Sequence, residues 1–502
     1  MWRRYLIMEK NIFLGIDLGT TGTKIVFMDS KGELRAKKSK EYSILNPKAE
    51  YAEQRPADWW ESVKELIKEA LAEEPELKDK VAALGIAGQM HTHVYLDAQN
   101  RVLRNAITWM DQRSQQIVER INKSSENKEI IYDTTANFLT TTYTAPNIVW
   151  VKENQPEIYQ KTEKILLAKD YLKFKLTGEM ETDYSDAAGT LLFDTYQKEW
   201  SEELFELFGI KKSLMPKVSP STKIIGEISS EAAAETGLMA GIPVINGSAD
   251  HAATALGAGV VNSGEVAAIL GTAGVISVLS DQRIGDENER VFCWNYCLED
   301  KWVNLAPMQT AGAALNWFKN EFDADNEEAY DIYNQEIESI ESGSDGLIFL
   351  PYLMGERSPI WDSKAKGVFF GIRMDHSKYH FVRAIMEGVS FAFKNNLEVI
   401  ESMGIKIDEM KFLGGGSKSE EWMEIMAGVL NKDIKVVVGS ETGALGISIM
   451  CGLALGLYQS PQKAAAIISS RTKDYSIPEI DQKYTANYSK FKKLYDNLKD
   501  LF

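Results

Sequence analysis

Hydrophobic and polar positions in the first hundred residues predict strands and one amphipathic helix. Residues 12 to 29 form two β-branched runs separated by a Gly/Thr turn, which predicts a hairpin. Apolar residues recur at helical spacing from Pro56 and stop before Pro75, which predicts a helix. Residues 81 to 87 form an apolar run that predicts a buried strand, and the loop Gly88-Gln89-Met90-His91 follows it. Ligands of α/β sheets gather at such strand ends, so this loop is a candidate binding element.

An internal repeat divides the chain into two halves. Residues 112 to 240 have a mostly helical pattern, and strand character returns at residue 241. Residues 19 to 29 align with residues 271 to 281, because each copy is a G-T-x-G turn and a strand that ends in Asp, with an apolar strand before it. The two copies predict a duplicated domain that closes around one ligand.

The remaining pattern predicts further helices, a strand and a loop in the second half. The predicted helices lie near residues 308–322, 377–402, 419–430 and 483–502, and a strand and loop lie at residues 410–416. The last helix is amphipathic, so we expect it to pack against the body of the protein.

Composition narrows the class of protein. A chain of 502 residues predicts two to four domains, and 44% apolar residues are enough to build their cores. The net charge of −17 argues against a nucleic-acid partner and against a surface attracted to anionic lipid. No apolar run approaches the roughly 20 residues that cross a bilayer, so we expect no membrane partner.

The cysteines and the first residues predict a cytoplasmic location. Cys293, Cys297 and Cys451 are too few and too unevenly spread for a disulfide framework, which indicates a reducing compartment. The first ten residues lack the apolar segment and small-residue cleavage site of a signal peptide.

The first Gly/Thr turn has the composition of a phosphate site. Glycines let backbone amides approach phosphate oxygens, threonines add hydroxyl donors, and the strand-end Asp17 can hold a divalent cation. The residues of this candidate ATP-binding turn are Gly19, Thr20 and Thr21, and those of its repeat are Gly271 and Thr272. Only the first copy carries the carboxylate, because Ile269 stands opposite Asp17. Two such turns can grip a polyphosphate from both sides, although each alone also fits a plain turn.

A second carboxylate, Asp250, directly follows the apolar strand at residues 242 to 245 and the loop after it. Phosphoryl transfer to an alcohol requires in-line positioning, charge neutralisation and an acceptor for the hydroxyl proton. Asp250 is our candidate for that acceptor. The alternative interpretation is an Asx cap on the Ala-rich helix that follows.

Two further segments are candidates for ligand contact. Gly414, Gly415, Gly416 and Ser417 follow a strand and precede a helix, and three glycines leave room for a flat base and ribose, although a flexible turn is also possible. Gln89, Met90, His91, Trp109 and Asp111 combine donors, acceptors and an aromatic wall, which is typical of a polyol site. His91 and His93 alone do not make a metal site, because a third ligand is missing nearby.

Several motifs together resemble the FGGY carbohydrate kinases, and within them the xylulokinase group. The likeness runs from Gly15 to about Leu457. The motifs are Gly85-Ile-Ala-Gly-Gln-Met-His91, Thr144-Ala-Pro146, Leu167-Ala-Lys-Asp-Tyr-Leu172, Ser185-Asp-Ala-Ala-Gly-Thr190, Phe349-Leu-Pro-Tyr-Leu353, Gly355-Glu-Arg-Ser-Pro359 and Lys366-Gly-Val-Phe-Phe-Gly371. The chain departs from the group at His251, where Asn is usual, at Asn147, and in Trp109-Met-Asp-Gln-Arg113.

The resemblance implies an α/β fold of two actin-like (ribonuclease H-like) ATPase domains with an interdomain cleft. It places a sugar-binding domain at residues 1–256 and a nucleotide-binding domain with a C-terminal helix at residues 257–502. It also implies that a homodimer can form.

The implied activity is ATP-dependent and Mg²⁺-dependent phosphorylation of a small-molecule sugar, with D-xylulose as the first candidate. The implied roles are Asp250 as base, Asp17 near Mg²⁺, and Gly271, Thr272 and Gly414 to Gly416 at the nucleotide. Sugar contacts are implied for Met90, His91, Trp109 and Asp111, and the departure at His251 lies beside them. Another ketose or a polyol, such as ribulose, L-xylulose, a hexulose or erythritol, stays open as the substrate. A non-catalytic sugar or nucleotide sensor on the same fold is a second alternative, which the presence of both Asp17 and Asp250 disfavours.

Overall fold

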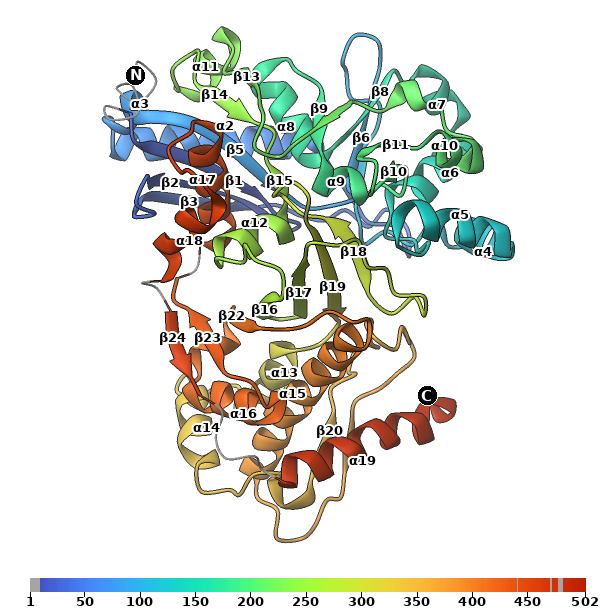
Figure 1. The fold of residues 1–502 in the computed structure, drawn as a ribbon, viewed down its shortest axis with the longest axis vertical. Coiled ribbons are helices and arrows are strands. Elements are labelled where there is room, and N and C mark those ends of the chain that lie inside the picture. The colour runs from blue at the N-terminus through green and yellow to red at the C-terminus, as the bar shows by residue number, and fades with distance from the viewer. Residues whose placement is uncertain (1–9, 440, 470–471, 477–481) are drawn as a thin grey trace.

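The computed structural model describes residues 10–439, 441–469, 472–476 and 482–502. The prediction about a signal peptide concerns the start of the chain, and residues 1–9 lie outside the described residues. Two halves lie one above the other in Figure 1, and each is built around its own mixed sheet with helices beside it.

The first sheet contains the predicted hairpin and the predicted buried strand side by side. Its strands are β1 (Ile12–Leu18), β2 (Gly22–Asp29), β3 (Leu34–Glu41), β5 (Val81–Gly88), β13 (Ile224–Glu227), β14 (Pro243–Ile245) and β15 (Ser248–Ala249). Their order is β13-β14-β5-β1-β2-β3, and β15 also pairs with β5. β1 pairs antiparallel with β2 and parallel with β5, so the ends of β1 and β5 lie at the same edge.

The second sheet repeats this arrangement, which confirms the internal repeat and the fold of two actin-like domains. Its strands are β16 (Glu265–Leu270), β17 (Gly274–Ser280), β18 (Phe292–Asn295), β19 (Trp302–Met308), β22 (Glu409–Leu413), β23 (Ile434–Val437) and β24 (Thr472–Tyr475). The order is β18-β19-β17-β16-β22-β23-β24. Here β16 and β17 form the hairpin and β22 runs parallel to β16, as β5 does to β1.

Helices surround both sheets, and small sheets extend each half. The helices of the first half are α2 (Pro56–Glu73), α3 (Leu77–Lys80), α4 (Gln115–Asn122), α5 (Ser125–Thr135), α6 (Thr144–Asn154), α7 (Pro156–Lys161), α8 (Ala168–Thr177), α9 (Tyr184–Ala188), α10 (Glu202–Phe208), α11 (Ser230–Thr236) and α12 (Asp250–Gly257). Those of the second half are α13 (Gly312–Phe322), α14 (Ala329–Ile337), α15 (Lys378–Ser402), α16 (Glu420–Leu430), α17 (Thr442–Ala454), α18 (Pro461–Ser469) and α19 (Gln482–Leu498). The short strands are β4 (Glu53–Gln54), β6 (His93–Leu96), β7 (Ala106–Ile107), β8 (Lys164–Leu167), β9 (Glu181–Asp183), β10 (Phe193–Asp194), β11 (Glu199–Trp200), β12 (Lys217–Ser219), β20 (Ile348–Leu350) and β21 (Val368–Phe370).

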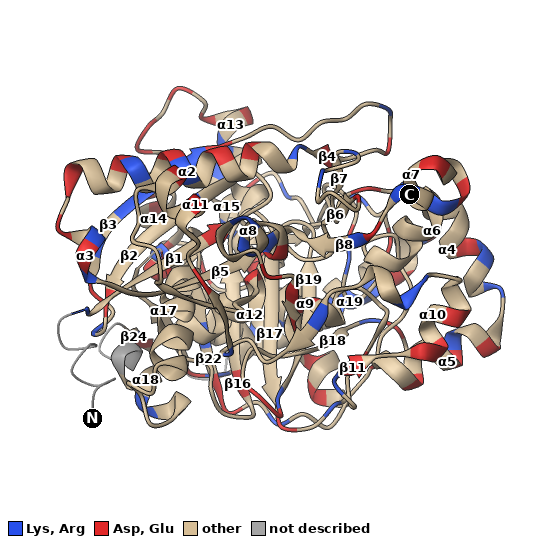
Figure 2. Ribbon diagram, turned by 90° about the horizontal axis from the view of Figure 1, so that it is seen from above, with Lys and Arg blue, Asp and Glu red and all other residues tan. Residues whose placement is uncertain are grey.

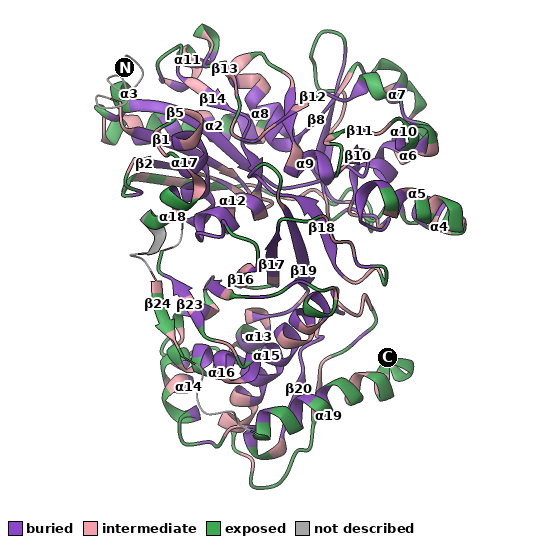
Figure 3. Ribbon diagram, in the orientation of Figure 1, coloured by how far each residue is buried: buried purple, intermediate pink, exposed green. Residues whose placement is uncertain are grey.

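Burial follows the pattern that predicted the elements. The central strands of both sheets are buried, whereas the outer helices are partly exposed (Figure 3). α2 buries Trp59, Val63 and Ile67 on one face, and charges of both signs lie along its outer side (Figure 2). The predicted C-terminal helix forms as α19, whose Tyr488 and Phe491 are buried. Hydrophobic burial of one face therefore holds both helices in place.

One predicted helix begins later than expected. The pattern placed it near residue 308, but β19 continues to Met308, which pairs with Gly274 of β17. The helix α13 starts at Gly312. Strand pairing across the sheet, which the local apolar pattern cannot show, decides this boundary.

The two halves meet where α12 crosses α17. Both helices contain a glycine at the crossing: a Cβ on Gly257 would lie 1.7 Å from the carbonyl oxygen of Thr442, and one on Gly446 would lie 1.9 Å from that of Ala253. Although α17 lies between β23 and β24 of the second sheet in sequence, it packs against β1 and β5 of the first. A division at residues 256 and 257 stays a prediction.

Candidate active site

Two carboxylates come together at the ends of neighbouring strands. Asp17 on β1 pairs in register with Ala87 of β5, and Ser248 of β15 pairs with the same Ala87 from the other side. Asp250 follows β15 directly and is the first residue of α12. The N-cap of this helix is Ala249, so Asp250 is not the Asx cap of the alternative interpretation.

Both carboxyl groups have raised pKa values. Burial raises the pKa of Asp17. Burial, and then the charge of Asp17, raise the pKa of Asp250 to about 7. Among the described residues no side chain donates a hydrogen bond to Asp17, and Asp250 accepts one only from the His251 amide, at 2.7 Å. An unpaired carboxylate at this edge suits Mg²⁺, which binds proteins through one or two carboxylates and keeps its other positions for water and phosphate.

A fully buried ionic network contacts the loop that precedes Asp250. Lys169 Nζ lies 2.7 Å from Asp170, 2.9 Å from Asp183 and 3.2 Å from Asp186. Lys173 Nζ contacts Asp170 at 2.9 Å. Burial raises the pKa of Asp186 to about 8.

This network holds the loop that carries Asp250. Lys173 donates a hydrogen bond to the carbonyl oxygen of Asn246 at 2.8 Å. Ser185 donates to Asp183 and accepts a hydrogen bond from the Ala249 amide at 3.0 Å. The backbone immediately before Asp250 is therefore fixed by buried, charge-assisted hydrogen bonds.

In both predicted phosphate turns, backbone carbonyl groups already accept hydrogen bonds. In the first turn the carbonyl of Gly19 accepts from Tyr42 at 2.5 Å, and that of Thr20 accepts from Gln54 at 2.5 Å. Within the described chain no hydrogen bond engages the amides of Thr20 and Thr21. In the second turn the carbonyl of Thr272 accepts from two amides at the start of α13. A turn with fixed carbonyls and free amides fits a phosphate oxygen.

A cavity of about 620 Å³ joins the second turn to the predicted glycine loop. It is lined by Gly271, Thr272, Gly312, Ala313, Leu315, Asn316, Tyr330, Asp331, Asn334, Met386, Gly415, Gly416, Lys418, Ser419 and Trp422. A further cavity of about 650 Å³ touches Gly414 and Ser417 on the other side of the loop. Four of the predicted nucleotide residues thus line one cavity, while Asn316, Asn334 and Lys418 were not predicted.

The glycine loop needs its first glycine for a steric reason. Gly414 has a φ of 106°, and a Cβ there would lie 2.6 Å from the carbonyl oxygen of Leu270. The loop can therefore lie against the end of β16 and leave the cavity open. The volume and the mixture of amides, hydroxyls and apolar groups fit an adenine nucleotide.

The sugar candidates Met90 and His91 lie at the end of β5. His91 adopts a φ of 65°, and its carbonyl oxygen accepts hydrogen bonds from Thr144 at 2.9 Å and from His93 at 2.9 Å. Its Nδ1 lies 2.6 Å from the carbonyl oxygen of Gly189, so Nδ1 donates and Nε2 is left as an acceptor. Burial lowers the pKa of His91 to about 4. The Nε2 atom of neutral His91 can therefore accept a hydrogen bond, and it has no partner among the described residues.

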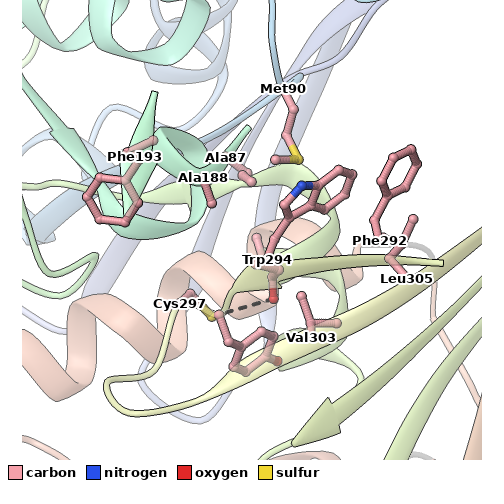
Figure 4. Packing of buried hydrophobic residues seen from close by; sticks show 14 of the residues in the cluster. Ala87, Met90, Ala188, Phe193, Phe292, Trp294, Cys297, Val303 and Leu305 are labelled. Atoms are coloured by element: carbon pink, nitrogen blue, oxygen red, sulfur yellow. Dashed lines mark hydrogen bonds between the residues drawn. The ribbon is translucent and has the colours of Figure 1, made fainter. Parts of the chain in front are cut away.

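Aromatic residues from both halves surround the two histidines. The ring of His91 lies 5.3 Å from Tyr143 and 5.6 Å from Trp294, and the ring of His251 lies 5.3 Å from Trp294. Met90, Phe292 and Trp294 belong to one buried cluster (Figure 4). Both ring nitrogens of His251 are buried without a hydrogen-bond partner in the described chain. The sequence pattern did not reveal Tyr143 or Trp294.

Three other sugar candidates already have polar partners. Gln89 donates to Gln54 at 2.8 Å and accepts from Thr92 at 3.1 Å. The carboxylate of Asp111 is held by Arg113 at 2.7 and 2.8 Å and by the amide of Ala52 at 2.6 Å. Trp109 donates from Nε1 to Thr20 Oγ1 at 2.9 Å. Gln89 and Asp111 therefore support the site's walls, and their contact with a sugar stays a prediction.

A histidine metal site does not form. His93 Nδ1 donates to His91, and His93 Nε2 accepts from Tyr95 at 3.0 Å. No group of three or more His, Cys, Asp or Glu suited to a metal ion occurs in the part of the chain that the structure describes. Arg357, which belongs to the motif Gly355-Glu-Arg-Ser-Pro359, places its guanidinium carbon 5.8 Å from the centre of the Trp109 ring.

Comparison with known proteins identifies the family. Residues 12–257 match the N-terminal domain of the FGGY family of carbohydrate kinases, and residues 266–455 match its C-terminal domain. The chain belongs to the FGGY family of carbohydrate kinases. This FGGY kinase thus carries both domains of the family, and it is a carbohydrate kinase enzyme.

The names of individual relatives refer to two different sugar substrates. A xylulose kinase of Bacillus subtilis (strain 168) is 34% identical over 490 residues, which are 97% of this chain and 97% of the relative. A gluconokinase of the same strain is 30% identical over 94% of this chain and 93% of the relative. The crystal structure of a xyloylose kinase from Brucella ovis covers 98% of this chain and 100% of its own, with a TM-score of 0.91 and 30% identity. No helix among the described residues of this FGGY kinase is long and apolar enough to cross a membrane.

Proposed function

We propose that this FGGY kinase transfers the terminal phosphoryl group of ATP to a hydroxyl of an open-chain ketopentose, D-xylulose, to give D-xylulose 5-phosphate. The observation that carries the proposal is the pair of buried carboxylates, Asp17 and Asp250, which lie on either side of Ala87 at the end of β5. The similarity to proteins named xylulose kinase supports D-xylulose as the sugar.

The proposed reaction needs one base. A sugar hydroxyl oxygen forms a bond to the terminal phosphorus while the bond from that phosphorus to the bridging oxygen of ATP breaks, and ADP leaves with the electron pair. Asp250 accepts the hydroxyl proton. A carboxyl with a pKa of about 7 is half ionised at neutral pH and is a stronger base than an ordinary aspartate.

Asp17 is placed to hold Mg²⁺, which neutralises charge on the phosphates when it is bound. The amides of Thr20 and Thr21 are available to phosphate oxygens, and Gly271 and Thr272 approach from the second half. Gly414 to Gly416 and Ser417 border the space for the base and ribose. His91 and His251 offer neutral imidazole groups to the sugar hydroxyls.

A coupled assay of ADP release tests the proposal. The enzyme is incubated with ATP and Mg²⁺ against D-xylulose, ribulose, L-xylulose, hexuloses, erythritol and D-gluconate, with a no-sugar control. We expect D-xylulose to give the highest kcat/KM. A higher value with another sugar would overturn the substrate, and a lack of release above the no-sugar rate with every compound would overturn the kinase reaction itself.

A further inference from the structure

Arg357 reaches across the cleft from the second half of the molecule. It lies in the loop between β20 and β21, and its guanidinium carbon is 5.7 Å from the ring of Trp361 and 5.8 Å from the ring of Trp109. Trp109 belongs to the first half and donates a hydrogen bond to Thr20 in the first phosphate turn. Arg357 therefore lies between two aromatic faces, one from each half.

The guanidinium of Arg357 lacks a partner among the described residues. No hydrogen bond or ion pair to it occurs in that part of the chain. The neighbouring carboxylate of Glu356 accepts instead from the amides of Gln309 at 2.6 Å and of Arg357 itself at 2.7 Å. Burial lowers the pKa of Arg357 to about 10, so it stays a cation at neutral pH. A partly buried cation with five unused N–H donors is costly unless a ligand accepts from it.

Arg357 lies on the His91 side of the site. Its charge contributes to the low pKa of His91. A continuous row of aromatic rings joins the two residues: Trp361 beside Arg357 lies 5.3 Å from Phe292, Phe292 stacks on Trp294 at 4.9 Å, and Trp294 lies 5.6 Å from His91. A sugar that gives its reacting hydroxyl to Asp250 and lies along His91 therefore extends its other end toward Arg357.

We propose that Arg357 is a specificity-determining residue that binds the sugar end remote from the phosphorylated hydroxyl and selects substrates with a C=O oxygen there. The inference rests on the proposed kinase function. A guanidinium only donates, and a ketone or carboxylate oxygen only accepts, so the two are matched. A ketose and an aldonate both present such an oxygen, whereas the corresponding alditol presents a hydroxyl.

Kinetics of R357Q and R357K test this inference. Substrates are D-xylulose, D-gluconate and D-arabinitol, which is one of the two alditols obtained by reducing D-xylulose. Loss of a hydrogen bond to a charged group is expected to lower kcat/KM for D-xylulose by about 10- to 100-fold in R357Q. The rate with D-arabinitol and the KM for ATP should change little, so the preference for ketose over alditol collapses. R357K, which keeps the charge but loses the planar fork, should fall between wild type and R357Q.

The substrate panel separates the two sources of the C=O oxygen. A larger loss with D-gluconate than with D-xylulose in R357Q assigns the contact to a carboxylate, and the reverse assigns it to the ketone. R373Q is the matched control, because Arg373 is exposed and paired with Asp375 at 2.9 Å, and we expect wild-type kinetics from it. The melting temperature of each variant checks folding, and R357K carries the test if R357Q does not fold.

Sugar binding without ATP distinguishes failure of the inference from failure of the proposed function. Trp109 and Trp361 flank Arg357, so their fluorescence can report sugar binding in wild type and variant. If wild type phosphorylates D-xylulose and R357Q keeps the wild-type ketose preference, the inference is wrong and the function stands. If wild type neither binds nor phosphorylates any of the three compounds, both are wrong. If wild type binds sugar without any turnover, and R357Q binds the sugar more weakly, Arg357 still contacts the sugar but the kinase reaction is wrong.

Discussion

At the scale of single residues, Asp250 is the group on which the proposed chemistry depends. In D250N the amide cannot accept the hydroxyl proton, so we expect kcat to fall by roughly 10²- to 10⁴-fold. Sugar binding should persist, because His91, His251 and Arg357 are unchanged. The ADP-release assay measures the first effect, and tryptophan fluorescence measures the second.

The matched control for D250N is D375N. Asp375 is an exposed aspartate that pairs with Arg373, far in sequence from the strand ends of the site. Wild-type turnover is expected from it. Near-normal turnover of D250N, or sugar binding lost together with turnover, would contradict the assigned role of Asp250.

Three buried histidines should make the stability of the protein depend on pH. Burial lowers the pKa of His91 to about 4, and those of His93 and His251 to about 3, from the ordinary 6.5. Below pH 6.5 the unfolded chain binds protons that the folded chain excludes. The contribution of these histidines to stability is therefore complete above about pH 6.5 and falls as the pH decreases, by up to about 1.4 kcal/mol per pH unit for each histidine. Asp186, Asp250, Glu356 and Glu387 have raised pKa values and contribute in the opposite direction.

His93 allows this effect to be isolated, because it lies outside the proposed catalytic and binding groups. In H93Q the amide can still donate to the His91 carbonyl and accept from Tyr95, but it cannot titrate. Urea unfolding at several values between pH 7.5 and 5 should show that the free energy of unfolding of wild type falls relative to that of H93Q as the pH decreases. Parallel curves for the two proteins would refute the linkage.

Among secondary-structure elements, the buried network of α8, α9 and β9 contains two aspartates whose pKa values shift in opposite directions: that of Asp186 is raised and that of Asp170 is lowered. Because burial raises the pKa of Asp186, we expect its carboxyl group to hold a proton at neutral pH. D186N should then preserve the charge of the network and change the free energy of unfolding by less than about 1 kcal/mol. Asp170 contacts both Lys169 and Lys173, so D170N leaves a buried ammonium group under-compensated. We expect it to cost about 3–5 kcal/mol.

Urea denaturation at pH 7 compares these two aspartate variants directly. Equal destabilisation by D186N and D170N would show that the proton does not reside on Asp186. Because the network holds the backbone before Asp250, folded D170N should also lose turnover, whereas D186N should retain it.

The crossing of α12 and α17 gives a second prediction at this scale. A methyl group at Gly446 would lie 1.9 Å from the carbonyl oxygen of Ala253, so G446A must push the helices apart. We expect a loss of at least about 1–3 kcal/mol in unfolding free energy and a fall in kcat, because α12 begins at Asp250.

S448A serves as the control for G446A, since Ser448 lies on the same helix α17 and bonds only to the Ala444 carbonyl one turn earlier. It should keep wild-type kcat. If G446A retains both wild-type stability and kcat, the tight crossing does not position Asp250.

At the scale of the whole molecule, the site is divided between two halves. Asp17, Asp250 and His91 belong to the first, whereas the nucleotide cavity and Arg357 belong to the second. We expect sugar and a non-hydrolysable ATP analogue together to reduce the radius of gyration more than either ligand alone, because closure excludes water from the site. Small-angle X-ray scattering at several protein concentrations measures this change and separates it from dimer formation. Additive effects of the two ligands would contradict coupled closure.

The sequence by itself determined the repeated fold and most of the candidate chemistry. Local turn composition and strand periodicity are short-range properties, so the hairpins at residues 12 to 29 and 265 to 280 could be read directly. Asp17, Asp250 and the glycine loop were found because each directly follows a strand, and the ends of neighbouring parallel strands meet.

Only the tertiary structure decided which polar groups are occupied and which are free. Asp111 and Gln89 read as sugar ligands in the sequence, but Arg113 and Gln54 already hold their polar atoms. Trp294 contacts His91 and Arg357 contacts Trp109 from the other half of the chain, and no local pattern records a contact between residues two hundred positions apart. Whether a polar group is hydrogen-bonded or desolvated depends on its neighbours in three dimensions. These neighbours decide which polar groups of the site remain available to a ligand.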